Sequence, residues 1–287
     1  GLSSVNGNTE PLFIIDGVAA NQNVFRSFNS EDIERIDVLK DAGATSIYGN
    51  RGANGVIVVK TKRGSYNSKL KVRYTATTGF TNLQDHDYKL TNAQQLLTLE
   101  NIVGAGMGAT LTPEQVAGWN SPLTPELSVG LTENQIKYWG TNTDWQKVFF
   151  RTGISKNHNL SFTQGSENMT NFTSLSYFDQ DGIVPNTGFK RFTFRTNFTG
   201  KSADGKFTYG TNLTAAYSKR VQLEQETRTD INANTLQNPL QGLLASQPYL
   251  NPAQYVNGQQ LFDEFGAPSF EINPFMLMDY LNPENIP

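Results

Sequence analysis

The sequence lacks cysteine and contains only two histidines, His86 and His158, among its 287 residues. Without cysteine the chain forms neither a disulfide scaffold nor a thiolate metal site. The two histidines lie far apart, and neither has further ligands at a metal-binding spacing, so we expect no metal site and no cofactor. The acidic cluster Glu224, Glu226 and Asp230 has no histidine near it and stands in a polar stretch. We therefore expect no catalytic residues and no enzyme activity.

Long hydrophobic runs are missing as well. A membrane-spanning helix needs about 18 consecutive apolar residues, and no segment approaches that length. The formal net charge is -3 and no lysine or arginine cluster occurs on a helix, which argues against a nucleic-acid partner. The chain starts at Gly1 without the basic and apolar regions of a signal peptide. We expect the numbering to begin inside a larger protein.

Aromatic and uncharged polar residues make up the share of the sequence that charged residues leave. Aromatic residues make up 11% of the chain and charged residues only 17%, and asparagine, threonine, serine, glutamine and glycine fill the difference. The length would suit two ordinary soluble domains, each with its own core. The composition argues against that interpretation, because it is typical of strands with one apolar face and one polar face.

The first 65 residues have the pattern of a compact α/β unit. Residues 12–15 predict a buried strand that ends in the turn Asp16-Gly17. Asn29 or Ser30 is a plausible helix cap, and acidic residues follow it. Further along, the patterns predict a strand at 36–40, a short helix at 41–49 that ends at Gly49, and a strand at 56–61.

From residue 69 onward apolar and polar residues alternate in five long segments, near 69–80, 157–164, 169–179, 191–198 and 207–218. Strict alternation indicates strands that separate two environments. In the last two segments one face is apolar and the other polar. On the apolar, lipid-facing side we expect Phe192, Phe194, Phe198, Phe207, Tyr209, Leu213 and Tyr217, and on the polar, lumen-facing side Arg191, Arg195, Asn197 and Asn212.

Segment lengths favour a membrane barrel over a soluble sandwich. Strands of about 10 to 12 residues suit a tilted crossing of a bilayer, whereas soluble strands average about 5 to 6 residues. The connections are long (82–156), short at Gly165, medium at 182–188, short at 203–205 and long again (220–287). Barrels alternate short periplasmic turns with long extracellular loops in this way, so the first strand is expected to run outward.

Two features of the first long connection predict short helices. Leucines recur at helical intervals in residues 92–103, and Thr112-Pro113 is a favourable helix start with proline at the first position. Such helices could contact substrate or a partner, or could simply pack within the loop. Both interpretations remain open.

Several ordered motifs carry a family resemblance. The segment DIERIDVLKDA at 32–42, followed by SIYG and ANGVI, closely resembles the plug domain of TonB-dependent outer-membrane transporters. More narrowly, PLFIIDGV at 11–18 and KTKRG at 60–64 resemble the SusC/RagA family of Bacteroidota, and further motifs between 143 and 192 follow it.

The resemblance implies a membrane all-β barrel of about 22 antiparallel strands in the full protein, roughly five of them here. A small N-terminal α/β plug domain would lie in the lumen. Residues 1–65 would be the later part of the plug, and residues 66–287 the start of the barrel with the two long extracellular loops.

The implied function is TonB-dependent active import of a glycan or peptide nutrient across the outer membrane. The implied partners are a SusD-like surface lipoprotein, the TonB-ExbB-ExbD complex and outer-membrane lipid, with a dimer of SusCD pairs as the assembly. One alternative is a ligand-sensing receptor on the same fold. Another is a secreted glycan hydrolase, which would be water-soluble.

The charged residues of the plug motif have two interpretations. They could form a ligand or signalling site, or they could hydrogen-bond the plug to the polar barrel wall, where an unpaired charge would be costly. We favour the second. We likewise expect Arg191 and Arg195 to pair with plug carboxylates rather than to guide an anionic substrate. The motif residues are Glu34, Arg35, Asp37, Lys40, Asp41 and Arg51.

Overall fold

The computed structural model describes residues 10–41, 45–84, 89–222 and 239–254. The chain divides into two compact units. The first comprises residues 1–79, 155–180 and 189–220, and the second comprises residues 80–154, 181–188 and 221–287. Each unit is described by itself. No helix among the described residues is long and apolar enough to cross a membrane.

The first unit contains a four-stranded sheet, here called the plug sheet. Its strands are β1 (Leu12–Ile15), β2 (Val18–Ala20), β3 (Ile33–Leu39) and β4 (Val56–Thr61), in the order β2-β1-β4-β3. β1 runs parallel to β4, and the other neighbours are antiparallel. Apolar side chains from the two central strands form its core: Phe13, Ile14, Ile15, Val56 and Val59.

A tight turn and a parallel pairing determine where β1 ends. Asp16 and Gly17 both have positive φ, 50° and 90°, which suits a two-residue hairpin from β1 into β2. In the parallel pair, Ile15 lies opposite Val59. The carboxyl ends of β1 and β4 therefore meet, and Asp16 comes next to Thr61.

The short helices of the plug agree only in part with the sequence pattern. Asn29 caps a 3₁₀ turn at Ser30–Asp32 by accepting a hydrogen bond from the Glu31 amide, as predicted. Helix α1 (Gln22–Ser27), capped by Asn21, was not predicted. The predicted helix end at Gly49 is confirmed, because Gly49, with φ 59° and ψ −150°, is non-helical and separates two 3₁₀ turns within Ser46–Gly52. Residues 42–44 of the predicted helix lie outside the described residues.

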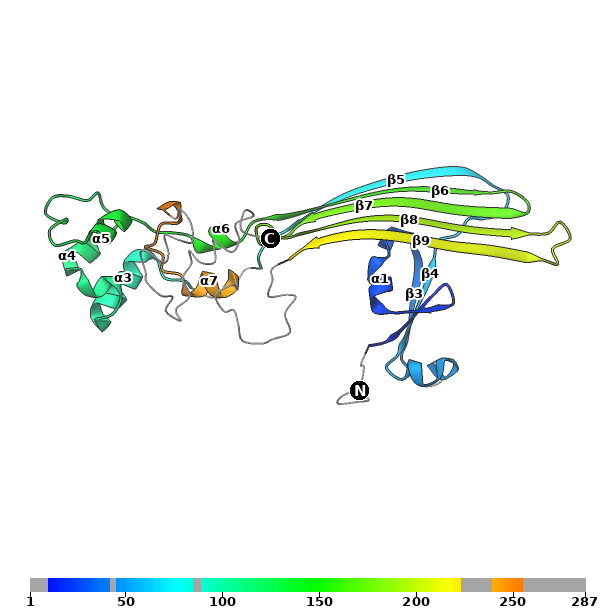
Figure 1. The fold of residues 1–287 in the computed structure, drawn as a ribbon, viewed down its shortest axis with the longest axis horizontal. Helices are drawn as coiled ribbons and strands as arrows, with labels where there is room; N and C mark the ends of the chain where they lie inside the picture. The colour runs from blue at the N-terminus through cyan, green and yellow to red at the C-terminus, as the bar shows by residue number, and fades with distance from the viewer. Residues whose placement is uncertain (1–9, 42–44, 85–88, 223–238, 255–287) are drawn as a thin grey trace. The chain divides into compact units, whose positions relative to one another are not determined.

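The second sheet of this unit, here called the wall sheet, consists of β5 (Ser68–Thr81), β6 (Gly153–Gly165), β7 (Met169–Asp181), β8 (Gly188–Lys201) and β9 (Thr208–Val221). The strands lie side by side in chain order (Figure 1). Each has 13 or 14 residues, so the predicted segments were correct in number and too short at their ends. Short turns join β6 to β7 and β8 to β9, as predicted.

On strand β8 of the wall sheet the polar side chains are buried and aromatic side chains are exposed, which is the reverse of the pattern in a soluble protein. On β8, Thr193, Arg195 and Asn197 are only 2–3% exposed, whereas Phe192 is 48% exposed. The weak alternation of β7 also has an explanation, because Phe172 lies on the buried face with Ser174 and Ser176. On β6–β8 the polar face is the one that is covered, whereas β5 and β9 are largely exposed on both faces.

The second unit is helical where it is described. Its helices are α3 (Ala93–Val103), α4 (Pro113–Ala117), α5 (Glu133–Tyr138), α6 (Trp145–Phe149) and α7 (Pro239–Ala245), with 3₁₀ turns at Met107–Thr110 and Pro252–Gln254. Both predicted helices are confirmed, α3 with a capping box from Asn92 and Gln95 and α4 with one from Thr112 and Gln115. Their apolar faces form one core around Leu97, Trp119, Phe149 and Leu243.

Candidate functional site

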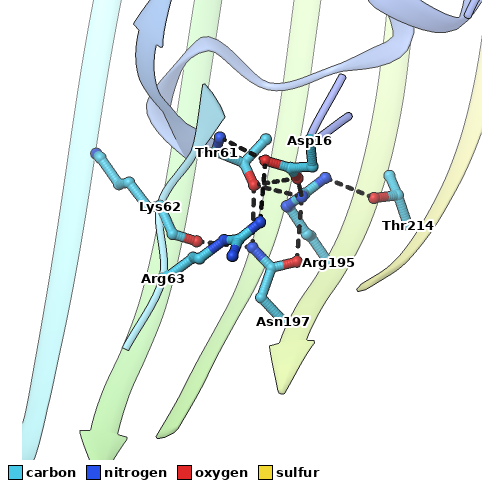
Figure 2. Close-up of polar contacts among 7 residues, drawn as sticks. All are labelled: Asp16, Thr61, Lys62, Arg63, Arg195, Asn197 and Thr214. Atoms are coloured by element: carbon cyan, nitrogen blue, oxygen red, sulfur yellow. Dashed lines mark hydrogen bonds and ion pairs between the residues drawn. The ribbon is translucent and has the colours of Figure 1, made fainter. Parts of the chain in front are cut away.

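The contact between the plug sheet and the wall sheet centres on an ion pair. Asp16 at the end of β1 accepts a 2.7 Å hydrogen bond at Oδ2 from Nη2 of Arg195 on β8. The side chains of Asp16 and Arg195 are 5% and 2% exposed, respectively. Figure 2 shows both side chains pointing into one cluster of polar groups. The two residues are 179 positions apart in sequence, so only the tertiary fold joins them.

Thr61 and Asn197 extend this cluster. The Thr61 hydroxyl donates to Asp16 Oδ2 at 2.6 Å and accepts from Arg195 Nη2 at 2.6 Å (Figure 2). Asn197 Nδ2 donates to the Lys62 carbonyl oxygen at 2.7 Å and to the Thr61 hydroxyl at 3.1 Å. On the other side, Arg195 Nη1 donates to the Thr214 hydroxyl of β9 at 2.8 Å. The plug is thus bonded to β8 directly, and Arg195 links this cluster to β9.

The electrostatics of this cluster favour a charged pair. Arg63 brings a second cation 3.8 Å from Asp16 Oδ1, and the Thr61 amide donates to the same oxygen at 3.0 Å. The guanidinium of Arg195 also lies 5.1 Å from the ring centre of Phe28, a cation-π contact from the plug side. Removing one member of such a buried pair leaves the other charge without compensation, at a cost of about 3–5 kcal/mol.

A second polar contact joins the 3₁₀ turn of the plug to β6 and β7. Asn29 Nδ2 donates to Asn159 Oδ1 at 2.9 Å, and both residues are buried. Asp32, 1% exposed, hydrogen-bonds Ser174 through its carboxylate. Its Oδ1 atom has no hydrogen-bond partner among the described residues. Burial raises the pKa of Asp32 above its ordinary value, although Ser174, Arg195 and Lys62 all oppose that shift.

Arg191 makes a third contact, nearer the start of β8. Its Nη1 donates to the backbone carbonyl of Arg26 in α1 at 2.8 Å. Its guanidinium also lies 5.8 Å and 5.9 Å from the ring centres of Phe178 and Phe189. Of the two arginines expected to pair with plug carboxylates, Arg195 does so and Arg191 binds a carbonyl instead.

The charged residues of the plug motif lie apart from these contacts. Arg35 and Asp37 pair with each other at 2.9 Å, with side chains 59% and 38% exposed. The other four are exposed: Glu34, Lys40, Asp41 and Arg51. The hydrogen bonds described above between the plug and β6–β8 come instead from Asp16, Arg26, Asn29, Asp32, Thr61 and Lys62.

The other residues singled out on β8 and β9 lie on one or the other of the two faces of the wall sheet. Asn212 is exposed and stands two positions before Thr214, hence on the face of β9 that Arg195 contacts. On the opposite face, exposed apolar side chains gather and their rings contact each other, as with Phe198 and Tyr209 at 5.9 Å. This face includes Phe192, Phe207, Tyr209, Leu213 and Tyr217, each at least 48% exposed, and the half-buried Phe194 and Phe198.

Sequence reasoning did not single out Asp16 or Thr61. A signal was present, because an acid directly after the buried run 12–15 and a threonine at the end of the β-branched run 56–61 stand at the ends of two strands. Their proximity required knowing that these strands are parallel neighbours. The chemistry of the cluster is binding rather than catalysis, since its groups hold each other. No group of three potential metal ligands occurs in the described part of the chain.

Comparison with known proteins agrees with this architecture. Residues 1–56 match the model of the TonB-dependent receptor plug domain. The TonB-dependent receptor SusC of Bacteroides thetaiotaomicron is 33% identical over 204 residues, which are 69% of this chain and 18% of that protein. The TonB-dependent receptor P26 of Formosa agariphila is 31% identical over 272 residues, 93% of this chain and 24% of that protein.

Solved structures agree as well. The RagAB peptide transporter superposes with a TM-score of 0.68 and 28% identity, over 88% of this chain and 28% of that one. The RagAB peptide importer in its closed-closed state gives a TM-score of 0.67 and 27% identity over the same shares. The chain spans about a fifth to a quarter of the length of the two curated relatives.

Proposed function

Because the chain belongs to the SusC/RagA type of TonB-dependent receptors, a family of non-enzymatic outer-membrane proteins, we propose that its protein imports a glycan or peptide nutrient. Import would be driven by the TonB-ExbB-ExbD complex. A SusD-like surface lipoprotein would cover the barrel as its partner. The assembly would be a dimer of such pairs.

One observation carries this proposal: a buried polar cluster, centred on Asp16 and Arg195, joins plug to wall. A plug must close the lumen at rest and still yield to a pulling force. Each hydrogen bond contributes only about 0.5–1.5 kcal/mol net, or about 1.5–3 kcal/mol where one group is charged, because water takes the place of the lost partner. A contact made of such bonds releases stepwise, without exposing a large apolar core.

The division of the chain follows from the same proposal. Residues 1–65 form the later part of the plug, and β5–β9 begin the barrel with their aromatic face toward lipid. The second unit then consists of extracellular loops, about 82–156 and 220–287. The exposed motif residues Glu34, Lys40, Asp41 and Arg51 would contact the rest of the wall or a bound ligand.

Uptake measurements test the proposal directly. The gene for the full receptor is deleted in its native cells, and uptake of labelled oligosaccharides and peptides is compared with the parent. We expect loss of uptake for one substrate class, restoration by the intact gene, and the same loss when TonB is removed. Unchanged uptake for every substrate, or recovery of the receptor in the soluble fraction, would contradict import.

A further inference from the structure

One end of the wall sheet has a row of charged side chains on its aromatic face, here called the charged row. It lies at the end of the sheet where the long connection from β5 enters β6 (Figure 1). Each member stands a few residues inside the end of its strand, and alternation along the strand places it on the face opposite the plug contacts. The members are Lys156 of β6, Asp179 of β7, Lys190 of β8 and Lys219 of β9.

Cross-strand pairing brings the first three members together. In the antiparallel pair of β6 and β7, Lys156 lies directly opposite Asp179. On the other side of β7, Nζ of Lys190 lies 3.3 Å from Oδ2 of Asp179, and the lysine side chain is 62% exposed. The single acid of the row thus stands between two lysines.

The fourth member is a lysine that faces another lysine. Arg195 on β8 bonds Thr214 on β9, and the short turn that joins the two strands gives the same register. Five residues further along each strand, this register places Lys190 opposite Lys219. Like charges directly opposite each other on neighbouring strands are unfavourable. Within the part of the chain that the structure describes, Lys219 has no ion pair to offset this.

Three lysines and one aspartate leave the charged row with two positive charges in excess. The lysines are exposed, so the row is open to a ligand from outside the protein. An anion bound beside Lys190 and Lys219 would separate their charges and would accept charge-assisted hydrogen bonds from both ammonium groups. The row therefore has the chemistry of a phosphate site.

A second row, of rings, lies two residues further from the strand ends, which is about 7 Å along the strands. Its members are exposed to different degrees, with Tyr177 at 42%, Phe192 at 48% and Tyr217 at 72%. His158 continues it on β6, directly opposite Tyr177. Aromatic rings of membrane barrels gather where headgroups meet acyl chains. With the aromatic face toward lipid, the charged row stands at the level of the headgroups.

We propose that the charged row binds the phosphate of a lipid in the outer leaflet, whose acyl chains lie along the row of rings. Charge and apolar surface stand next to each other here in the order in which a phosphorylated lipid presents them. A free phosphate ion would use only the first of these two features. The inference goes beyond import, and it rests on the proposed function only for the orientation of the wall sheet in the membrane.

Lipid binding to the full-length receptor in a nonionic detergent tests this proposal by native mass spectrometry. The probes are monophosphoryl lipid A and the same lipid A after removal of its phosphate. We expect the phosphorylated lipid to bind at least about tenfold more tightly, because each lysine near an anionic headgroup strengthens binding about fivefold. Added salt should reduce the difference. Equal binding of the two lipids, or displacement of the lipid by the same concentration of inorganic phosphate, would overturn the inference.

Variants locate the site. Lys156→Gln and Lys219→Gln should each lower affinity for the phosphorylated lipid about fivefold. The matched control is Lys206→Gln, in the turn at the other end of β8 and β9, where the side chain is 85% exposed; its affinity should not change. Asp179→Asn removes the acid of the row and should raise the affinity, a gain that misfolding does not produce. Unchanged affinity in folded Lys219→Gln and Asp179→Asn proteins overturns the assignment.

The two proposals fail in different ways. A receptor that imports its nutrient from the outer membrane but binds both lipids equally contradicts this inference alone. A receptor that selects the phosphorylated lipid but supports no uptake contradicts import alone.

Discussion

At the scale of single residues, the guanidinium of Arg195 explains why one arginine organises the contact between plug and wall. It presents five N–H donors in a planar fork and stays charged at every physiological pH. Its Nη2 reaches Asp16 and Thr61 in the plug, and its Nη1 reaches Thr214 in the neighbouring strand. A lysine at this position would present a single point charge, so it would not bridge three elements.

The strength of this pair can be measured by a double-mutant cycle with Arg195→Met and Asp16→Asn. We expect Arg195→Met to destabilise plug attachment by about 3–5 kcal/mol, because it leaves a buried carboxylate unpaired. The coupling energy of the pair should be about 2 kcal/mol or more. Ser176 on the covered face of β7 is 5% exposed, so a cysteine in its place should react with a maleimide only after the plug detaches. The quantity measured is the urea concentration at which this cysteine becomes reactive.

The exposed pair of Arg35 and Asp37 is the matched control. It has the same residue types at 2.9 Å, but its side chains are 59% and 38% exposed. Water screens such a pair, so the cycle of Arg35→Met and Asp37→Asn should give about 0.2–1 kcal/mol. Equal coupling energies for the two pairs would show that burial does not strengthen the pair of Asp16 and Arg195.

Asp32 should make plug attachment depend on pH. Burial raises its pKa in the folded state above the ordinary value of 3.8. At a pH between 3.8 and the raised pKa of the folded state, the Asp32 carboxyl has lost its proton in the unfolded plug and keeps it in the folded plug. The free energy of plug attachment therefore becomes less favourable as pH rises through this window. In Asp32→Asn this loss of stability is absent. We expect the stability of the variant relative to the native protein to increase with pH, measured by the same urea assay from about pH 4 to pH 7. A constant difference would contradict this.

At the scale of elements, β8 has opposite requirements on its two faces. Its polar side chains are buried against the plug, and its aromatic side chains are exposed. In water this arrangement would leave an unfavourable apolar surface. In a bilayer the aromatic face would be solvated by lipid, and the polar face hydrogen-bonds the plug through Arg191, Arg195 and Asn197.

A lysine on each face tests this orientation. Phe194→Lys, at the middle of β8, should destabilise the folded receptor in lipid vesicles by about 2–4 kcal/mol, since a charge at the centre of a bilayer is costly. Asn212→Lys, on the face of β9 shared with Thr214, should have little effect. The folded fraction is measured by its altered electrophoretic mobility. A larger destabilisation by Asn212→Lys than by Phe194→Lys would mean that the face with Asn212, and not the face with Phe194, is directed toward lipid.

At the scale of the whole molecule, short turns and long connections should lie on opposite sides of the membrane. Val129 is 72% exposed in the long connection between β5 and β6, and Ala203 is exposed in the turn between β8 and β9. In intact cells, a membrane-impermeant maleimide should label Val129→Cys and should label Ala203→Cys only after the outer membrane is permeabilised. None of these 287 residues is a cysteine, and the receptor without the two substitutions gives the background labelling. The opposite labelling pattern would invert the proposed topology.

Local sequence pattern was enough to predict the five strands of the wall sheet, the two faces of β8 and β9, and the plug strands β1 and β4, whereas β2 was not predicted. These features depend on local periodicity, which a single chain displays directly. The ends of the wall strands were not predicted correctly. The strands extend past their alternating segments, because backbone pairing with a neighbouring strand continues where the side chains no longer alternate. Helix α1 was missed because its six residues bury none of their side chains and so show no apolar face.

The polar contacts between the plug and the strands described here became evident only in the folded structure. Asp16, Thr61 and Asn29 contact β6 and β8. The plug-motif residues singled out in the sequence, Glu34, Arg35, Asp37, Lys40, Asp41 and Arg51, stay a prediction for the rest of the wall. Local pattern shows that a residue is polar, whereas its partner depends on which strands become parallel neighbours and which sheet covers them. Arg195 and Asp16 are 179 residues apart, and no periodicity spans that distance.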